Sequence, residues 1–273
     1  MSIVFSAAIG HAPGWTAWNE RATHEQRDAL AASMATLSKE LAEARVDALI
    51  MLTSEHWANF FLDHISAFCV GRGDVFEGPI EGWLKIDRTD IAGDPELATQ
   101  IIDAAYAQDF EPSFGHELKL DHGTMVPLSL LAPKLDVPIV PVFFNTLAAP
   151  QPSPRRCFEL GRVIGDVARK SDKRIGIVAT GGMSHDPGER SHGEINSDFD
   201  KAFLDQMARG DTRELSGYSV TQLAAAGAGA IELLAWIALA GALGNFKGDV
   251  LAYEAVHAWA TGMGVMRLTE TAA

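Results

Sequence analysis

Continuous apolar runs alternate along the chain with segments of helical periodicity. Short apolar runs bounded by turn residues predict buried strands, and apolar residues recurring every three or four positions predict amphipathic helices. Strands are expected at 2–9, 46–53, 137–145 and 174–181, and short strands with turns are expected in the glycine-containing segment 65–93. Helices are expected at 23–45, 94–108, 124–134, 152–170, 197–209 and 219–244.

Local signals refine two of these elements. Thr23 and Gln26 have the spacing of a capping box, in which each side chain satisfies a backbone N–H at the start of a helix. Pro138 and Pro141 lack the N–H that a sheet ladder requires, so they are expected either on an edge strand or at the ends of the strand that contains them.

The order of elements predicts the fold class. Alternation of strand and helix favours an α/β fold with a central, largely parallel or mixed sheet flanked by helices. The 273 residues can bury a full core, and no repeat or linker divides them. We therefore expect a single catalytic domain over residues 1–273.

One apolar segment carries a charge. Residues 223–244 have the length of a membrane span, but Glu232 lies near the middle and would cost about 2.5–3.5 kcal/mol in a bilayer. A buried core helix is expected instead. A glutamate is rarely buried unless it is paired or binds a metal, so either a salt bridge or a metal is expected at Glu232.

Composition limits the classes of partner that the chain can bind and the compartment in which it is expected. The chain has 22 basic and 36 acidic residues, a net charge of −14, and this disfavours nucleic acid and anionic membrane surfaces as partners. The two cysteines, Cys69 and Cys157, form no disulfide framework, so a cytoplasmic location is expected. The N-terminal apolar run lacks a basic region before it and is interpreted as a first strand rather than a signal peptide.

Histidines follow three of the predicted strands. His11 follows the first strand, His56 the second, and His185 the strand at 174–181. Ligands in open α/β sheets bind beyond the carboxyl ends of the strands, so these three side chains are expected at one cleft. His122 lies in a loop just before a helix and is a fourth candidate.

Two histidines and one carboxylate are the ligand set of non-haem Fe(II) oxygenases, which leaves one face of the metal open. His11, His56 and Glu232 are the candidate set here, and the same donors also suit Mn(II) and Zn(II). His122 and His185 then remain free for proton transfer near neutral pH.

These residues stand in motifs that resemble those of the class III extradiol ring-cleaving dioxygenases, the superfamily of the protocatechuate 4,5-dioxygenase β subunit. The resemblance extends from about residue 3 to about residue 265. Its five stretches are Gly10-His11-Ala12-Pro13, Ser54-Glu55-His56 with Asn59-Phe60, Leu120-Asp121-His122-Gly123, Thr180-Gly181-Gly182-Met183-Ser184-His185, and Ala230-Ile231-Glu232-Leu233.

The resemblance implies a site and a reaction. His11, His56 and Glu232 would bind Fe(II), and His185 and His122 would be the catalytic acid/base groups. The expected reaction is extradiol (meta) cleavage of a catecholic compound in aromatic catabolism, in which both atoms of dioxygen are incorporated and a ring-opened semialdehyde-type product forms. Candidate substrate contacts are Asn59, Asp121, His192 and His257.

The resemblance also bears on partners and alternatives. It implies a small ortho-dihydroxy aromatic substrate and a homo-oligomer, with or without a small second subunit. Two alternatives are a non-catalytic metal- or partner-binding member of the same fold, and a Zn-dependent hydrolase that uses His185 as its base. Relatives without catalysis typically lose one of the five key positions, and all five are present here.

Overall fold

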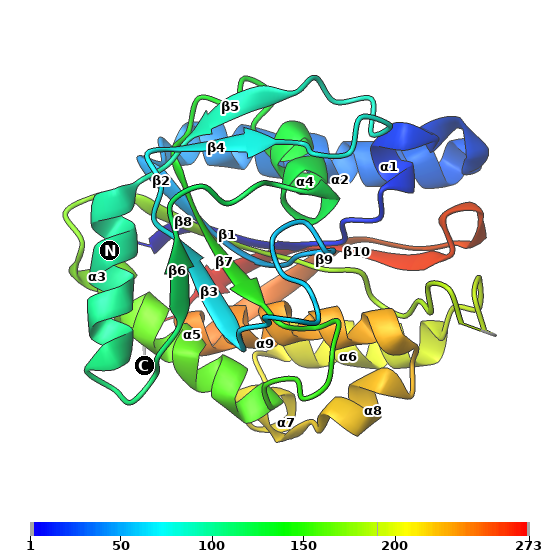
Figure 1. Cartoon of the computed structure of the whole chain (residues 1–273). Helices are drawn as coiled ribbons and strands as arrows, with labels where there is room; N and C mark the ends of the chain where they lie inside the picture. Colours follow the sequence, from blue (N-terminus) through cyan, green and yellow to red (C-terminus); the bar gives the residue numbers. More distant parts are fainter. Residues whose placement is uncertain (1–2, 190, 272–273) are drawn as a thin grey trace.

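The chain folds around one large mixed sheet. The computed structural model describes residues 3–189 and 191–271. Within them, eight strands follow the order β6-β3-β7-β2-β8-β1-β10-β9, and helices cover both faces (Figure 1). The predicted fold class is therefore confirmed. The strands are β1 (Ile3–Ile9), β2 (Ala48–Ser54), β3 (Phe68–Gly71), β6 (Ser113–Gly115), β7 (Ile139–Phe144), β8 (Ile175–Thr180), β9 (Phe246–Val256) and β10 (Thr261–Glu270).

The centre of the sheet is parallel. β7, β2, β8 and β1 run in the same direction. Beyond β1, β10 pairs antiparallel with β1, and β9 pairs antiparallel with β10. Four neighbouring strands therefore present their carboxyl ends at one edge, where loops can converge on a ligand. A separate antiparallel pair, β4 (Val75–Gly78) and β5 (Thr89–Ala92), forms from the segment expected to hold short strands.

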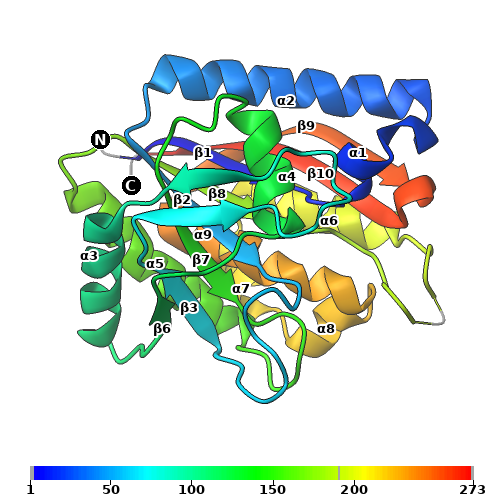
Figure 2. The ribbon, with the colours of Figure 1, turned by 45° about the horizontal axis from the view of Figure 1, so that its top comes forward.

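Side chains of β2 alternate between two cores. Ile50 and Leu52 face one core, and Leu49 and Met51 face the other, as the two-residue period of a strand requires. The first core is covered by α3 (Pro95–Tyr106), α5 (Pro154–Lys170), α6 (Ser197–Arg209), α7 (Thr212–Gly217) and α9 (Leu233–Leu243). The second is covered by α1 (Gly14–Ala17), α2 (His24–Ala44), α4 (His122–Leu131) and the small sheet (Figure 2).

The predicted helix at 219–244 is wrong as one continuous element. It is divided into α8 (Val220–Ala224), a 3-10 segment (Ala228–Glu232) and α9. The break is at Gly227, whose φ of +112° belongs to a conformation that favours glycine, and whose missing side chain leaves room for the carbonyl of His185. No helix among the described residues is long and apolar enough to cross a membrane.

Of the two positions expected for the prolines, the edge of the sheet is wrong, whereas Pro138 does lie at an end of the strand, directly before β7. β7 lies between β3 and β2 inside the sheet. β3 is short and pairs only with residues 142–144 of β7, so Pro141 lies past the end of that ladder. Gly71 makes room for the ring, because a Cβ at that position would lie 2.5 Å from Pro141 Cγ.

The terminal hairpin of β9 and β10 was not predicted. Glycines at positions 248, 262 and 264 interrupt its apolar pattern. By contrast, the capping box of Thr23 and Gln26 is confirmed at the start of α2.

Helices α5 and α9 make the closest helix contact of the first core through glycines. A Cβ at Gly161 would lie 1.9 Å from the carbonyl oxygen of Ala238, and one at Gly165 would lie 2.1 Å from that of Ala242. Backbone therefore meets backbone across this interface, with no flexible side chain that can yield.

We expect Gly161→Ala to lower the free energy of unfolding by about 1–3 kcal/mol, because the added methyl forces two packed helices apart. Urea denaturation followed by circular dichroism measures this change. Gly217→Ala is the matched control, since nothing lies within 4 Å of a Cβ at that position at the end of α7. Equal stabilities of the two variants would contradict the contact.

Candidate metal centre and active site

Three acid/base side chains converge at the carboxyl edge of the sheet. His11 lies two residues beyond β1, His56 two residues beyond β2, and Glu232 at the junction between the 3-10 segment and α9. His11 and Glu232 are buried, with 2% and 3% of their surfaces exposed. All three line a cavity of about 610 Å³. The predicted ligand set is thus brought together by segments far apart in sequence.

The glutamate lies between the two imidazoles. Glu232 Oε2 lies 2.9 Å from His11 Nε2, and Glu232 Oε1 lies 3.0 Å from His56 Nε2. The backbone N–H of Gly182 donates to Glu232 Oε2 at 2.6 Å, which fixes the carboxylate from the side of β8.

The outer nitrogens of both histidines have protein partners. His11 Nδ1 lies 3.3 Å from Thr180 Oγ1, and His56 Nδ1 lies 3.1 Å from Asp121 Oδ2. The side chain of Asp121 also accepts the backbone N–H groups of His56 and Gly123. An imidazole that donates through Nδ1 presents the lone pair of Nε2 on its other side, as metal-binding histidines do.

A metal fits this arrangement. Nε2 of His11 is buried and has no hydrogen-bond partner, although a carboxylate oxygen lies close to it. Buried nitrogens without a partner are rare in native proteins, and a bound ion is one way in which such an atom is satisfied. Two imidazole nitrogens and a carboxylate that face a common point suit a divalent transition metal.

The electrostatics of the site are tightly coupled. Burial alone would lower the pKa of His56, but Asp121 and Glu232 hold it well above its usual value. Burial alone would raise the pKa of Glu232, yet His11 and His185 hold it well below its usual value. Burial alone would raise the pKa of Asp121, but His56 lowers it to about 2.

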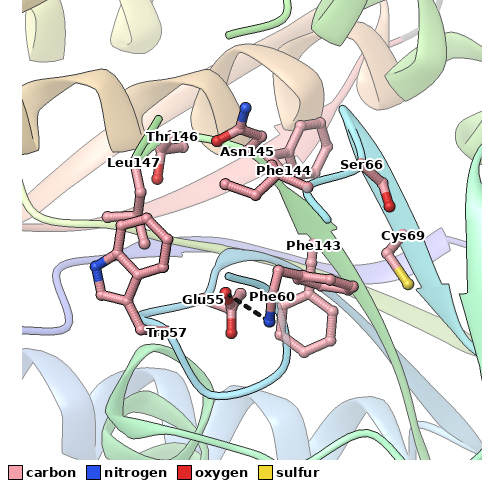
Figure 3. A pocket seen from close by; sticks show the side chains of 11 residues that line it. Glu55, Trp57, Phe60, Ser66, Cys69, Phe143, Phe144, Asn145, Thr146 and Leu147 are labelled. Carbon is pink, nitrogen blue, oxygen red and sulfur yellow. Dashed lines mark hydrogen bonds between the residues drawn. The ribbon is translucent and has the colours of Figure 1, made fainter. Parts of the chain in front are cut away.

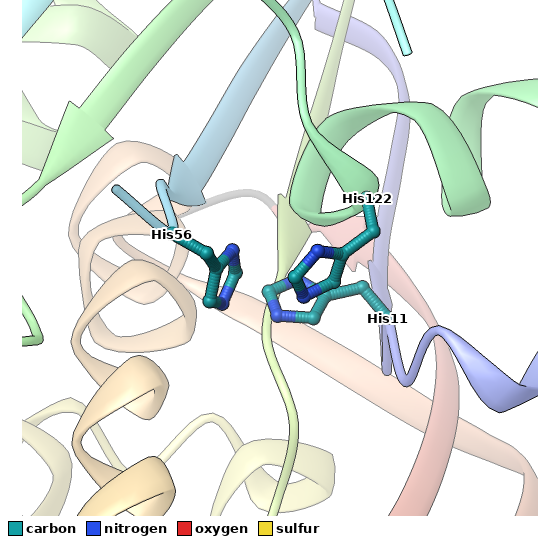
Figure 4. A group of neighbouring side chains, drawn as sticks. All are labelled: His11, His56 and His122. Carbon is teal, nitrogen blue, oxygen red and sulfur yellow. The ribbon is translucent and has the colours of Figure 1, made fainter. Parts of the chain in front are cut away.

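His122 lies beside the cluster without contacting Glu232 through any described hydrogen bond. Its ring stacks on that of His56 with centroids 3.9 Å apart, and one ligand atom each of His11, His56 and His122 lies within 4.8 Å of the others (Figure 4). Its Nδ1 lies 2.7 Å from Glu81 Oε1. Burial and the nearby charge of His56 lower the pKa of His122, which favours a neutral ring.

His185 also lies near Glu232. Its Nδ1 lies 3.0 Å from the carbonyl of Met183, and its Nε2 lies 3.9 Å from Glu232 Oε1. Two glycines leave space for the ring, because a Cβ at Gly229 would lie 2.1 Å from Nε2 and one at Gly182 would lie 2.5 Å from Cε1.

A buried carboxylate anchors the loop that carries His185. Asp200 accepts the backbone N–H and the hydroxyl of Ser184 at 2.8 and 2.7 Å, and the hydroxyl of Tyr253 at 2.8 Å. Burial raises the pKa of Asp200. These bonds hold the backbone at Ser184, directly before His185.

The four candidate substrate contacts occupy different places. His192 lines the cavity. Among the described residues, the lining does not include Asn59, Asp121 or His257. Asn59 exchanges hydrogen bonds with the backbone of Lys119, Asp121 is fully buried behind His56, and His257 is exposed with Nδ1 3.3 Å from the carbonyl of Gly193.

Several groups at or next to the cavity could not be predicted from the sequence. Glu81 lies in the glycine-containing segment and stands in no motif, so nothing in the sequence connected it with His122. The aromatic wall was also missed, since single tryptophans carry no spacing signal. The wall contains Trp18, Trp57 and Trp259.

Comparisons with known proteins show the family of the chain. A family model described as the catalytic LigB subunit of aromatic ring-opening dioxygenase matches residues 6–264. A 2,3-dihydroxyphenylpropionate/2,3-dihydroxicinnamic acid 1,2-dioxygenase of Burkholderia vietnamiensis (strain G4 / LMG 22486) is 28% identical, over 84% of this chain and 88% of that protein. An enzyme of the same name from a Rhodococcus species is 26% identical, over 87% and 90%.

A solved structure supports the fold. An uncharacterized protein from Escherichia coli K12 superposes with a TM-score of 0.64 at 15% identity and covers 96% of this chain and 98% of its own. The chain belongs to the LigB family of aromatic ring-opening dioxygenases. The resemblance inferred from the motifs and the class of enzyme, an extradiol ring-cleaving dioxygenase, are thereby confirmed.

We expect Asp121→Asn to weaken metal binding by about 10–100-fold, because the amide no longer orients and polarises the His56 ring as the carboxylate does. Titration of the metal-free protein against a chelating indicator measures the change. Asp63→Asn, at an exposed position of the loop after His56, is the control and should bind as wild type. Unchanged affinity in Asp121→Asn would argue against His56 as a ligand.

We expect Gly229→Ala to lower turnover by about 10²–10⁴-fold, the range typical of a lost acid/base group, because the added methyl displaces the His185 ring. Metal content should stay at the wild-type level, since the atoms nearest to a Cβ at Gly229 all belong to the His185 ring and to none of the three proposed ligands. Turnover and metal content are measured on the same sample. Wild-type turnover would show that the position of His185 does not matter.

Proposed function

We propose that the chain is a non-haem Fe(II) dioxygenase that cleaves the ring of a catecholic compound at the extradiol position. Both atoms of dioxygen enter the product, a ring-opened semialdehyde. The observation that carries this proposal is the convergence of Nε2 of His11 and Nε2 of His56 on the buried carboxylate of Glu232. His122 and His185 lie near the same carboxylate or ring cluster, and each is tied elsewhere through Nδ1.

In this proposal His11, His56 and Glu232 hold the iron. When bound, Fe(II) supplies a Lewis acid and a path for electrons between the aromatic ring and dioxygen. The chain supplies a fixed set of donors: Thr180 and Asp121 orient the two imidazoles, and the Gly182 N–H orients the carboxylate.

The two remaining histidines move protons. His122 is held by Glu81 through Nδ1, so its Nε2 is free to take a proton from a substrate hydroxyl. The lowered pKa of His122 favours the neutral form that this step requires. His185 donates through Nδ1 to the Met183 carbonyl, and its Nε2, 3.9 Å from Glu232 Oε1, is free to exchange a proton.

The cavity and the relatives indicate the substrate. The cavity of about 610 Å³ exceeds what a bare catechol ring needs, and its apolar wall includes Trp57, Ile231 and Trp259. Relatives are named for 2,3-dihydroxyphenylpropionate and its cinnamic analogue. We propose a catechol with a side chain on the ring as the substrate.

The setting of the enzyme is part of the proposal. We propose that residues 1–273 act as one catalytic domain within a homo-oligomer in the cytoplasm. The two cysteines are free and buried, as suits a reducing compartment. The family favours the dioxygenase over a zinc hydrolase or a non-catalytic binding protein.

The proposal predicts oxygen uptake by protein loaded with Fe(II) under anaerobic conditions. With 2,3-dihydroxyphenylpropionate, protocatechuate and gallate as the panel, we expect stoichiometric uptake and a coloured ring-opened product from at least one member. Removal of the iron by a chelator should abolish uptake, and Fe(II) should restore it. Equal restoration by Zn(II) would contradict an oxygenase.

Two variants separate binding from chemistry. His185→Ala should retain iron and lose about 10²–10⁴-fold in turnover. His56→Ala should lose iron, because the metal keeps only two of its three protein ligands. An iron-loaded wild type that consumes no oxygen with any member of the panel, or a His56→Ala variant that keeps its iron, would overturn the corresponding assignment.

A further inference from the structure

The loop after β7 lies at the same edge of the sheet as the proposed metal site, but no residue of it has a role so far. β7 ends at Phe144 and α5 begins at Pro154. Between them, Thr146, Leu147 and Gln151 line the large cavity. Since β7 runs parallel to β2, its carboxyl end delivers this loop to the place where ligands of α/β sheets bind.

Thr146 carries a hydroxyl that the fold does not use. The residue is buried, with 3% of its surface exposed, and its Oγ1 has no hydrogen-bond partner among the described residues. The neighbouring Asn145 is fully engaged with its own loop, since it donates to the carbonyl of Ala148 and accepts the N–H of the same residue. The loop geometry is thus maintained by Asn145, and Thr146 remains free.

Thr146 also stands at the opening of a second, much smaller hollow. Trp57, Thr146 and Leu147 line both the large cavity and this crevice, whose free volume is about 20 Å³ (Figure 3). The inner wall of the crevice is mainly apolar and contains Phe60, Ile65, Cys69, Phe143 and Phe144. The carboxylate of Glu55 also lines it, and its oxygens are engaged by backbone N–H groups of its own loop. A volume of this size admits one small molecule or the end of a short substituent, and not an aromatic ring.

We propose that Thr146 is a specificity-determining residue that donates a hydrogen bond to an oxygen atom on the ring substituent of the substrate. This inference rests on the proposed function. The two ring hydroxyls are accounted for by the metal and by His122 and His185, so the polar group left for Thr146 is on the side chain of the catechol. A buried hydroxyl left unpaired by an analogue that lacks this oxygen disfavours that analogue.

The test compares two substrates that differ only in the carboxylate of the side chain. They are 2,3-dihydroxyphenylpropionate and 3-propylcatechol, whose side chains have the same number of carbons. Thr146→Val keeps the shape of the side chain and removes the hydroxyl. We expect kcat/KM for the propionate to fall by about 10–100-fold, the range of one hydrogen bond to a charged group, while 3-propylcatechol changes by less than about twofold.

The loss should appear in KM rather than in kcat, because a contact with the substituent is present in both the bound substrate and the transition state. Thr146→Ser restores the hydroxyl and should restore the preference. Thr124→Val is the matched control, since Thr124 is fully buried with an unpartnered hydroxyl but does not line the cavity. Its ratio of kcat/KM between the two substrates should equal that of wild type.

Anaerobic calorimetric titration of the iron-loaded protein gives a readout that does not depend on turnover. The Kd of the propionate should rise in Thr146→Val and that of 3-propylcatechol should not. Unfolding in urea should show no loss of stability, because the hydroxyl has no partner in the fold. Equal losses for both substrates, or lowered stability, would overturn the inference while the dioxygenase stands. A wild type that binds neither catechol would overturn the proposed function itself.

Discussion

The buried carboxylate of Glu232 lies at the centre of the candidate site, at the carboxyl edge of the parallel strands. Glu232 lies in a strongly apolar part of the chain, and a charge there persists only when it is paired, hydrogen-bonded or bound to a metal. His11, His56 and the N–H of Gly182 face it from the loops that follow β1, β2 and β8. The site therefore exists only when three strands and the segment before α9 are all in register, so the chemistry depends on the whole parallel centre of the sheet.

Much of this arrangement could be read from the sequence, because a few rules act locally. A glutamate inside an apolar run indicates a compensated charge, and histidines placed directly after predicted strands must meet at one edge of a parallel sheet. The capping box at Thr23 depends only on spacing along one helix. These features carry their physical reason within a few residues.

The features that could not be predicted depend on contacts between distant segments. The break at Gly227 follows from the carbonyl of His185, which belongs to a loop much earlier in the chain. The interior position of β7 depends on the shortness of β3 and on space left by Gly71 beneath Pro141. Glu81 and Asp121 could not be assigned to His122 and His56, since only the folded chain shows which ring each carboxylate meets.

The strand order places the groups around Glu232 and the loop that carries Thr146 on different strands of the same sheet edge. The donors that face Glu232 come from β1, β2 and β8, whereas the loop with Thr146 follows β7, on the far side of β2. Asn145 holds that loop by contacts to its own backbone, with no described bond to the donors. Substitutions in the loop can therefore accumulate without disturbing the catalytic centre. Enzymes built on this architecture can change the ring substituent that they accept and keep the same reaction.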